Sequence, residues 1–128
     1  MIKPTTVIFI IAASVLAVTN YLAIELHLYW FYSWFDLTTH TLGGAVAALG
    51  VYVLKDFCPR LPTRFQRFSV VWSFVFLVAI AWELFEVWAG ISTNEPGYAL
   101  DTVLDLVMGM TGGLIGYFVG KSIRNLDV

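Results

Sequence analysis

The chain has 128 residues, of which 59% are apolar and only 12% are charged, and its formal net charge is −2. Charged residues make up about a quarter of an ordinary soluble domain, so this composition indicates a single-domain integral membrane protein. The slight acidity and the lack of a long basic stripe argue against a nucleic-acid partner. The single cysteine, Cys58, excludes an internal disulfide and a cysteine metal cluster.

Four apolar stretches are long enough to cross roughly 30 Å of hydrocarbon at about 1.5 Å per residue. They predict helices over residues of about 5–26, 35–54, 68–90 and 98–120. The first stretch exceeds the roughly 7 to 15 residues of a signal-peptide core, so we expect it to be retained. The aromatic run 29–34 between the first two stretches is typical of an interfacial belt. The predicted fold is an all-α membrane protein, with residues 1–128 forming one antiparallel bundle of four transmembrane helices.

The positions of the basic residues predict the orientation. Every Lys and Arg lies before the first span, between the second and third spans, or after the fourth, and the other two loops contain none. By the positive-inside rule, both termini and the middle connector are cytoplasmic, and Glu95 lies outside.

Acidic residues occur within these spans without a neighbouring cation. Together with one histidine, the set is Asp36, His40, Glu83, Glu86, Asp101 and Asp105. An ionised group at the centre of the membrane costs roughly 2.5 to 3.5 kcal/mol on insertion scales, so such residues indicate a functional site. Spacings of three or four residues place each pair on one side of its helix. Counting inward from the outer ends places His40, Glu83 and Asp105 about one turn deeper than the others, within direct or single-water hydrogen-bonding reach.

Small residues continue these helical faces towards the cytoplasmic side. They are Gly43, Gly44 and Ala47 in the second span and Gly109, Gly112, Gly116 and Gly120 in the fourth. Small residues at every fourth position let helices approach closely in lipid. We expect these faces to form the bundle interior, and they could equally pair two copies of the chain as a homo-oligomer.

Two effects can relieve the unbalanced negative charge: shared protons or a bound cation. Helical bundles hold metals with facing Asp, Glu and His side chains, and an oxygen-rich set favours Mn, Mg, Ca or Fe over Zn. The expected metal ligands are Asp36, His40, Glu83, Asp101 and Asp105. If the protein is an enzyme, the expected chemistry is metal-assisted hydrolysis or transfer on a lipid headgroup, with Glu83 or Glu86 as the general base.

Simpler interpretations exist for the same residues. Asp36 and Asp101 can interact with the free N–H groups of helix N-termini, and Glu86 can reach water. The deeper residues can form a hydrogen-bond network that only fixes helix packing. The protein would then be a non-enzymatic binding or assembly subunit. An ion pathway has less support, because the polar faces become apolar or glycine-rich in the inner leaflet.

Three motifs follow one another along the chain: Asp36-x-x-x-His40, Glu83-x-x-Glu86 and Asp101-Thr102-x-x-Asp105, the last followed by Gly112-Gly113. Together they resemble the small membrane proteins of the VanZ-like group and the related YjdF-like proteins over roughly residues 34–116. The resemblance implies a multi-pass protein of the bacterial inner membrane. For the VanZ-like branch it also implies an association with glycopeptide resistance and the cell envelope. The expected partners are therefore membrane lipid and a lipid-linked envelope component.

Overall fold

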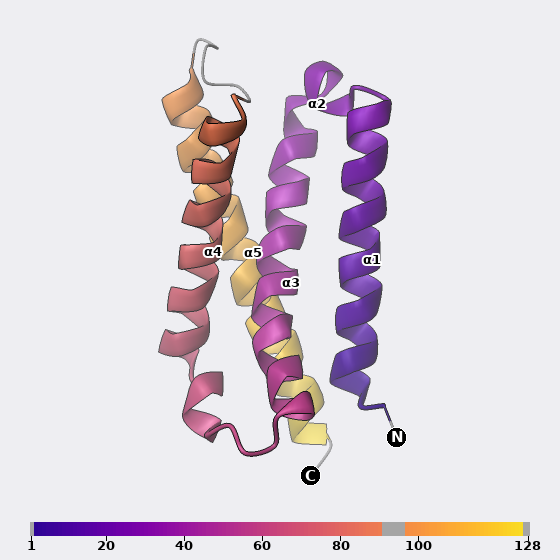
Figure 1. The fold of residues 1–128 in the computed structure, drawn as a ribbon, viewed down its shortest axis with the longest axis vertical. Coiled ribbons are helices and arrows are strands. Elements are labelled where there is room, and N and C mark those ends of the chain that lie inside the picture. Colours follow the sequence, from indigo (N-terminus) through magenta and orange to yellow (C-terminus); the bar gives the residue numbers. More distant parts are fainter. Residues whose placement is uncertain (1, 91–96, 127–128) are drawn as a thin grey trace.

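A computed structural model describes residues 2–90 and 97–126, and within these ranges the chain is helical and contains no strand (Figure 1). The elements in order are α1 (Pro4–Glu25), α2 (Leu28–Phe31), α3 (Ser33–Phe57), the 3₁₀ helix η1 (Thr63–Gln66), α4 (Phe68–Ala89) and α5 (Tyr98–Leu126). Of these, α1, α3, α4 and α5 are long and apolar enough to cross a membrane. The predicted all-α membrane fold with four spanning helices is confirmed.

Local sequence explains several helix ends. Pro4 is the first residue of α1, where its missing N–H removes no helical hydrogen bond. Gly90 ends α4 with φ of 73°, a left-handed conformation that glycine adopts without steric cost. The predicted end of the second span at residue 54 is too early, because α3 continues to Phe57. It stops before Cys58, whose non-helical conformation (φ −122°) fits a residue that precedes Pro59.

A buried carboxylate explains why α3 and α5 are both longer than predicted. The Asp56 side chain is only 4% exposed, and it accepts hydrogen bonds from Arg124 of α5, at 2.5 Å, and from the Thr6 hydroxyl of α1, at 3.2 Å. The Lys3 ammonium lies 3.3 Å from the same carboxylate. Arg124 also donates to the carbonyl of Tyr52 at 3.0 Å. These contacts keep α5 helical beyond residue 120, where the predicted fourth span ends.

Glycines let α3 and α5 pack with their backbones almost in contact. A Cβ atom added to Gly44 would overlap the carbonyl of Gly109 and lie 2.9 Å from the Gly113 nitrogen. The same holds for Gly112 against the backbone of Thr41. Gly116 packs in the same way against Ala45, and Gly120 packs against the ring of Tyr52. The glycine-rich face of α5 is therefore used within one chain, and pairing of two chains through it stays an untested expectation.

Gly43 departs from this pattern. No atom outside its immediate helical surroundings lies within 4 Å of a Cβ built on it. The expectation that Gly43 lines the bundle interior is therefore wrong, because the rotation of α3 presents Gly44 to α5 and leaves its neighbour open.

The apolar core lies mainly between α3, α4 and α5. It contains Ala48, Val51, Tyr52, Val71, Val75 and Tyr117. Large aliphatic side chains such as Ile11, Leu77 and Val107 are 58%, 64% and 54% exposed. In a bilayer, where lipid chains are as apolar as these side chains, outward-facing residues of this kind carry no penalty.

The first residues of α1, the last residues of α5 and the connector between α3 and α4 lie at the same end of the bundle (Figure 1). This agrees with an antiparallel arrangement of the four spans. Which side of the membrane this end occupies stays a prediction, and Glu95 lies outside the described residues.

Cys58 offers a direct test of the orientation, because it is the only cysteine and it is exposed in that connector. We expect a membrane-impermeant maleimide to label Cys58 in inside-out vesicles and to leave it unlabelled in right-side-out vesicles. The matched control is Cys58→Ser combined with Trp30→Cys, because Trp30 is 80% exposed in α2 at the opposite end. Its labelling should be reversed. Labelling of Cys58 from the outside would overturn the assignment of sides.

Candidate functional site

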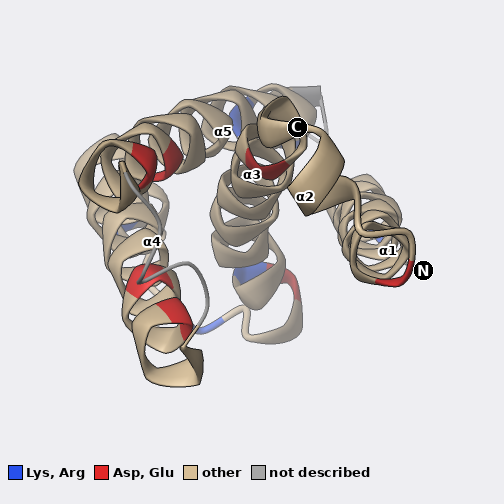
Figure 2. Ribbon diagram, turned by 90° about the horizontal axis from the view of Figure 1, so that it is seen from above, with Lys and Arg blue, Asp and Glu red and all other residues tan. Residues whose placement is uncertain are grey.

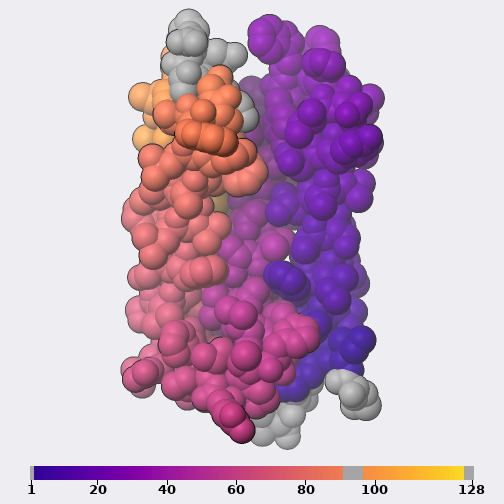
Figure 3. All heavy atoms as spheres, in the orientation of Figure 1, coloured from indigo at the N-terminus to yellow at the C-terminus, as the bar shows by residue number. Residues whose placement is uncertain are grey.

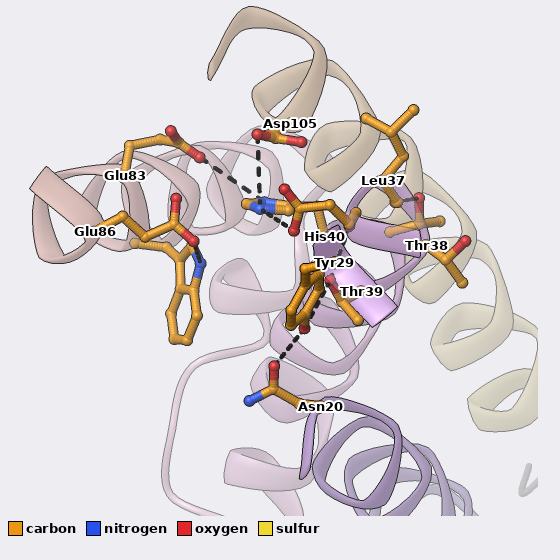
Figure 4. Close-up of polar contacts among 12 residues, drawn as sticks. Asn20, Tyr29, Leu37, Thr38, Thr39, His40, Glu83, Glu86 and Asp105 are labelled. Atoms are coloured by element: carbon orange, nitrogen blue, oxygen red, sulfur yellow. Dashed lines mark hydrogen bonds and ion pairs between the residues drawn. The ribbon is translucent and has the colours of Figure 1, made fainter. Parts of the chain in front are cut away.

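His40 is the centre of a polar cluster formed by three helices (Figure 4). Its Nε2 atom lies 3.6 Å from Oδ1 of Asp36 on α3 and 3.9 Å from Oδ2 of Asp105 on α5. Its Nδ1 atom lies 3.9 Å from Oε1 of Glu83 on α4. The structure thus brings together the three residues that the sequence placed in the deeper layer, His40, Glu83 and Asp105.

The cluster is buried, although no ion pair compensates its carboxylates with a described Lys or Arg. The side chains of His40, Glu83 and Asp105 are 7%, 9% and 3% exposed, whereas that of Asp36 is 30% exposed. Figure 2 shows the acidic positions of α4 and α5 in red, with no Lys or Arg position beside them. Burial without a partner disfavours charged carboxylates, so the cluster needs protons or a cation.

Several polar atoms of the cluster lack a hydrogen-bond partner. They are Nε2 of His40, both carboxylate oxygens of Glu83, Oδ1 of Asp105 and Oγ1 of Thr102. A buried polar atom left unpaired costs roughly 1 to 3 kcal/mol, and a charged one costs more. Because native proteins pair nearly all such atoms, we expect a shared proton, a water molecule or a cation among them.

Two overlapping sets of side chains have the spacing of metal ligands. In one, Asp36, His40 and Asp105 each offer an atom within 4.8 Å of the others; in the second, His40, Glu83 and Glu86 do so. Two ligands on opposite sides of an ion with bonds of about 2.4 Å are about 4.8 Å apart, so each set lies within the span of one shared ion.

The remaining two expected residues differ in position. Glu86 is half-buried, belongs to the second set, and accepts a hydrogen bond of 2.8 Å from the Trp82 indole. Asp101 is exposed in the first turn of α5 and belongs to neither set. The geometry gives no support to Asp101 as a ligand, and that role stays a prediction.

Tyr29, which belongs to the aromatic run expected at the membrane interface, borders the cluster. Its hydroxyl donates to Oδ1 of Asn20 on α1 at 2.5 Å and lies 3.5 Å from the hydroxyl of Thr39 on α3. Burial raises the pKa of Tyr29 above its usual value, and the negative charges of Asp36 and Glu86 raise it further, against the opposing effect of the Thr39 hydrogen bond. Asn20 is a lone amide in an apolar span, and such a residue predicts a hydrogen-bond partner outside its own helix.

Comparison with known proteins identifies a family. The family model described as "Predicted membrane protein (DUF2238)" matches residues 2–125. The chain belongs to this family. No curated protein and no solved structure matches it significantly.

The DUF2238 assignment agrees with the four candidate spans and establishes a multi-pass membrane protein. It confirms the coarse part of the sequence resemblance, a small membrane-protein family. The more specific VanZ-like or YjdF-like relationship stays a prediction.

In this DUF2238 protein the two ring nitrogens of His40 have different surroundings. Nε2 faces Asp36 and Asp105, while Nδ1 faces Glu83. Metal-binding histidines commonly hold the metal with one nitrogen and donate the other N–H to a carboxylate, which fixes the ring and raises its basicity. Nε2 of His40 therefore faces the carboxylates that could share a cation with it, and Nδ1 faces the carboxylate of Glu83, which could orient the ring.

Proposed function

We propose that this protein binds a divalent cation at the His40 cluster and uses it to bind or modify a lipid component of the cell envelope, from the outer side of a bacterial inner membrane. The observation that carries this proposal is a buried imidazole that faces carboxylates from three helices, with unpaired buried atoms on His40, Glu83 and Asp105. One cation would supply the missing partner to several of these atoms at once.

The geometry suggests a role for each residue. Asp36, His40 through Nε2, and Asp105 would hold the ion, while Glu83 would orient His40 through Nδ1. Carboxylates with a single imidazole suit Mn, Mg, Ca or Fe better than Zn. A bound ion would polarise a substrate oxygen or a water molecule, and Glu83 or Glu86 could accept the proton in a hydrolysis.

A non-enzymatic role, in which the cluster only fixes helix packing, is the alternative. Such a network would hold its members at hydrogen-bond distances of about 2.7 to 3.2 Å. The ring-to-carboxylate separations of 3.6 to 3.9 Å are longer than this. The spacing therefore favours a site that closes around a further group over a completed packing network.

Elemental analysis tests the proposal. Protein purified in detergent, stripped with a chelator and reloaded with Mn²⁺ is expected to retain about one ion per chain, because a preformed ligand set binds with useful affinity. His40→Ala should retain none. His27→Asn is the control, because His27 is exposed and its left-handed backbone (φ 54°) suits Asn. Retention well below one ion in the parent protein, or equal retention in His40→Ala, would contradict a cation site at His40.

A further inference from the structure

One face of the bundle is open beside the cluster. In the described residues α1 packs against α3 and slightly against α5, and makes no contact with α4. Seen from above, α1 and α4 lie on two sides of α3 and α5 lies on a third (Figure 2). The space-filling view shows a hollow on the remaining side, between α4 in salmon and α1 in indigo (Figure 3). We call this hollow the α3 groove.

Gly43 marks the open part of the α3 groove. Nothing lies within 4 Å of a Cβ added there, although Gly44 beside it is in backbone contact with α5. Lower on α3, the ring of Phe9 from α1 lies 3.4 Å from a Cβ built at Gly50 and closes the groove. From His40 to Gly50 the helix rises about 15 Å, roughly half the thickness of the hydrocarbon layer.

The α3 groove leads to the His40 cluster at its outer end. Asp36 and Gly43 are seven residues apart and so share one side of α3. Asp36 is also the most exposed of the three carboxylates around His40, at 30% against 9% for Glu83 and 3% for Asp105. A molecule lying in the groove would therefore meet the cluster at its accessible carboxylate.

We infer that the α3 groove holds an acyl chain of a phospholipid with an amine headgroup, whose ammonium group lies at the outer rim of the cluster beside Asp36. The apolar surroundings of a membrane favour a hydrocarbon chain in the groove. Charge selects the headgroup, because Asp36, Glu83, Glu86, Asp101 and Asp105 stand at this end without a described Lys or Arg. Even one divalent cation leaves carboxylates in excess, so an ammonium group is preferred to an anionic headgroup.

This inference rests on the proposed function, since it assigns a binding position to the lipid of that proposal. The lipid would enter the α3 groove laterally from the outer leaflet. It gives Asp36 a second role, in which the oxygen turned away from His40 contacts the headgroup. The lipid would reach the cation site without leaving the bilayer.

The test compares thermal unfolding of delipidated protein with added phosphatidylethanolamine or phosphatidylglycerol carrying the same acyl chains. Phosphatidylethanolamine is expected to raise the unfolding temperature by about 5 °C or more, as a ligand bound only to the folded state does, and phosphatidylglycerol by much less. Gly43→Leu should lose this difference, because the leucine side chain would extend into the groove from a position where an added Cβ meets no atom within 4 Å. Equal stabilisation by the two lipids would overturn the inference.

The control variant, Thr111→Leu, adds a similar side chain on another face of the bundle. Thr111 lies on a shallow apolar surface between α4 and α5 that also includes Trp72, Phe76 and Leu114. The variant should therefore keep the parent response to lipid. A Gly43→Leu protein that responds like the parent would show that the chain does not lie in the α3 groove.

Mn²⁺ retention by Gly43→Leu separates this inference from the proposed function. Normal retention with a lost lipid response supports both. Normal retention with an unchanged lipid response leaves the cation site intact and rejects the groove. A lipid response that is lost only in Gly43→Leu, in a parent that binds no Mn²⁺, rejects the cation site and supports the groove.

Discussion

Asp105→Asn is expected to abolish the cation-dependent part of the protein's thermal stability. The Asp105 side chain is 3% exposed and its Oδ2 faces Nε2 of His40 at 3.9 Å. The amide keeps the shape of the carboxylate but loses the charge that attracts the ion. In the parent, an ion at 100 times its dissociation constant should add about 2.7 kcal/mol to the free energy of unfolding. The measurement is thermal unfolding of both proteins with and without Mn²⁺ or Ca²⁺.

Two further variants sharpen this experiment. Asp101→Asn should keep the full response, because Asp101 is exposed and lies outside both ligand sets. Glu83→Gln should weaken ion binding about 10-fold to 100-fold if Glu83 acts through His40, as is usual for a residue that orients a ligand. Complete loss in Glu83→Gln would instead make Glu83 a direct ligand.

The packing alternative gives a different result for the same proteins. Without a cation, Asp105→Asn removes a buried charge that lacks a hydrogen-bonded partner and should be neutral or stabilising. Identical unfolding curves with and without ions, in the parent and in Asp105→Asn, would contradict the cation site and any enzymatic role built on it.

Gly44→Ala is expected to destabilise the protein by about 3 kcal/mol, at the upper end of the usual range for overpacking. The added methyl group would overlap the Gly109 carbonyl, and backbone atoms cannot move aside as a flexible side chain can. Separation of α3 from α5 would also displace His40 from Asp105. The free energy of unfolding can be measured by titration with a denaturing detergent.

The neighbouring residue provides the control for this prediction. Gly43→Ala meets no atom within 4 Å, and alanine in a helix interior is favoured over glycine by about 0.5 to 1 kcal/mol. It should therefore be neutral or slightly stabilising. Equal destabilisation by Gly43→Ala and Gly44→Ala would mean that α3 is rotated differently about its axis.

The contrast between these two glycines shows which features of the fold could be predicted from the sequence and which could not. Hydropathy and helical spacing predicted the four spans and the meeting of His40, Glu83 and Asp105, because span length and periodicity depend on local sequence. They could not distinguish Gly43 from Gly44, since both positions adjoin the side of α3 that carries Asp36 and His40. That distinction depends on where α1, α4 and α5 pack, which is set by contacts between distant segments.

Other differences have the same origin. The extension of α3 and α5 depends on the contact of Asp56 with Arg124, two residues that lie beyond the predicted ends of the second and fourth spans. The inward position of Tyr29 depends on Asn20, although its neighbours Trp30 and Phe31 are 80% and 70% exposed as expected for interfacial residues. Asp101, in contrast, shares the spacing of the other acidic residues and still lies outside the cluster.

The Asp56 contacts have a consequence for the order in which the bundle assembles during synthesis. Lys3, Thr6 and Asp56 are made before α4, so α1 and α3 can meet around this carboxylate early. Its nearest partner, Arg124, is synthesised only after α4 and most of α5. Insertion in successive pairs would therefore leave Asp56 with Lys3 and Thr6 as its only partners until α5 is made, so the full set of contacts around this carboxylate would form last.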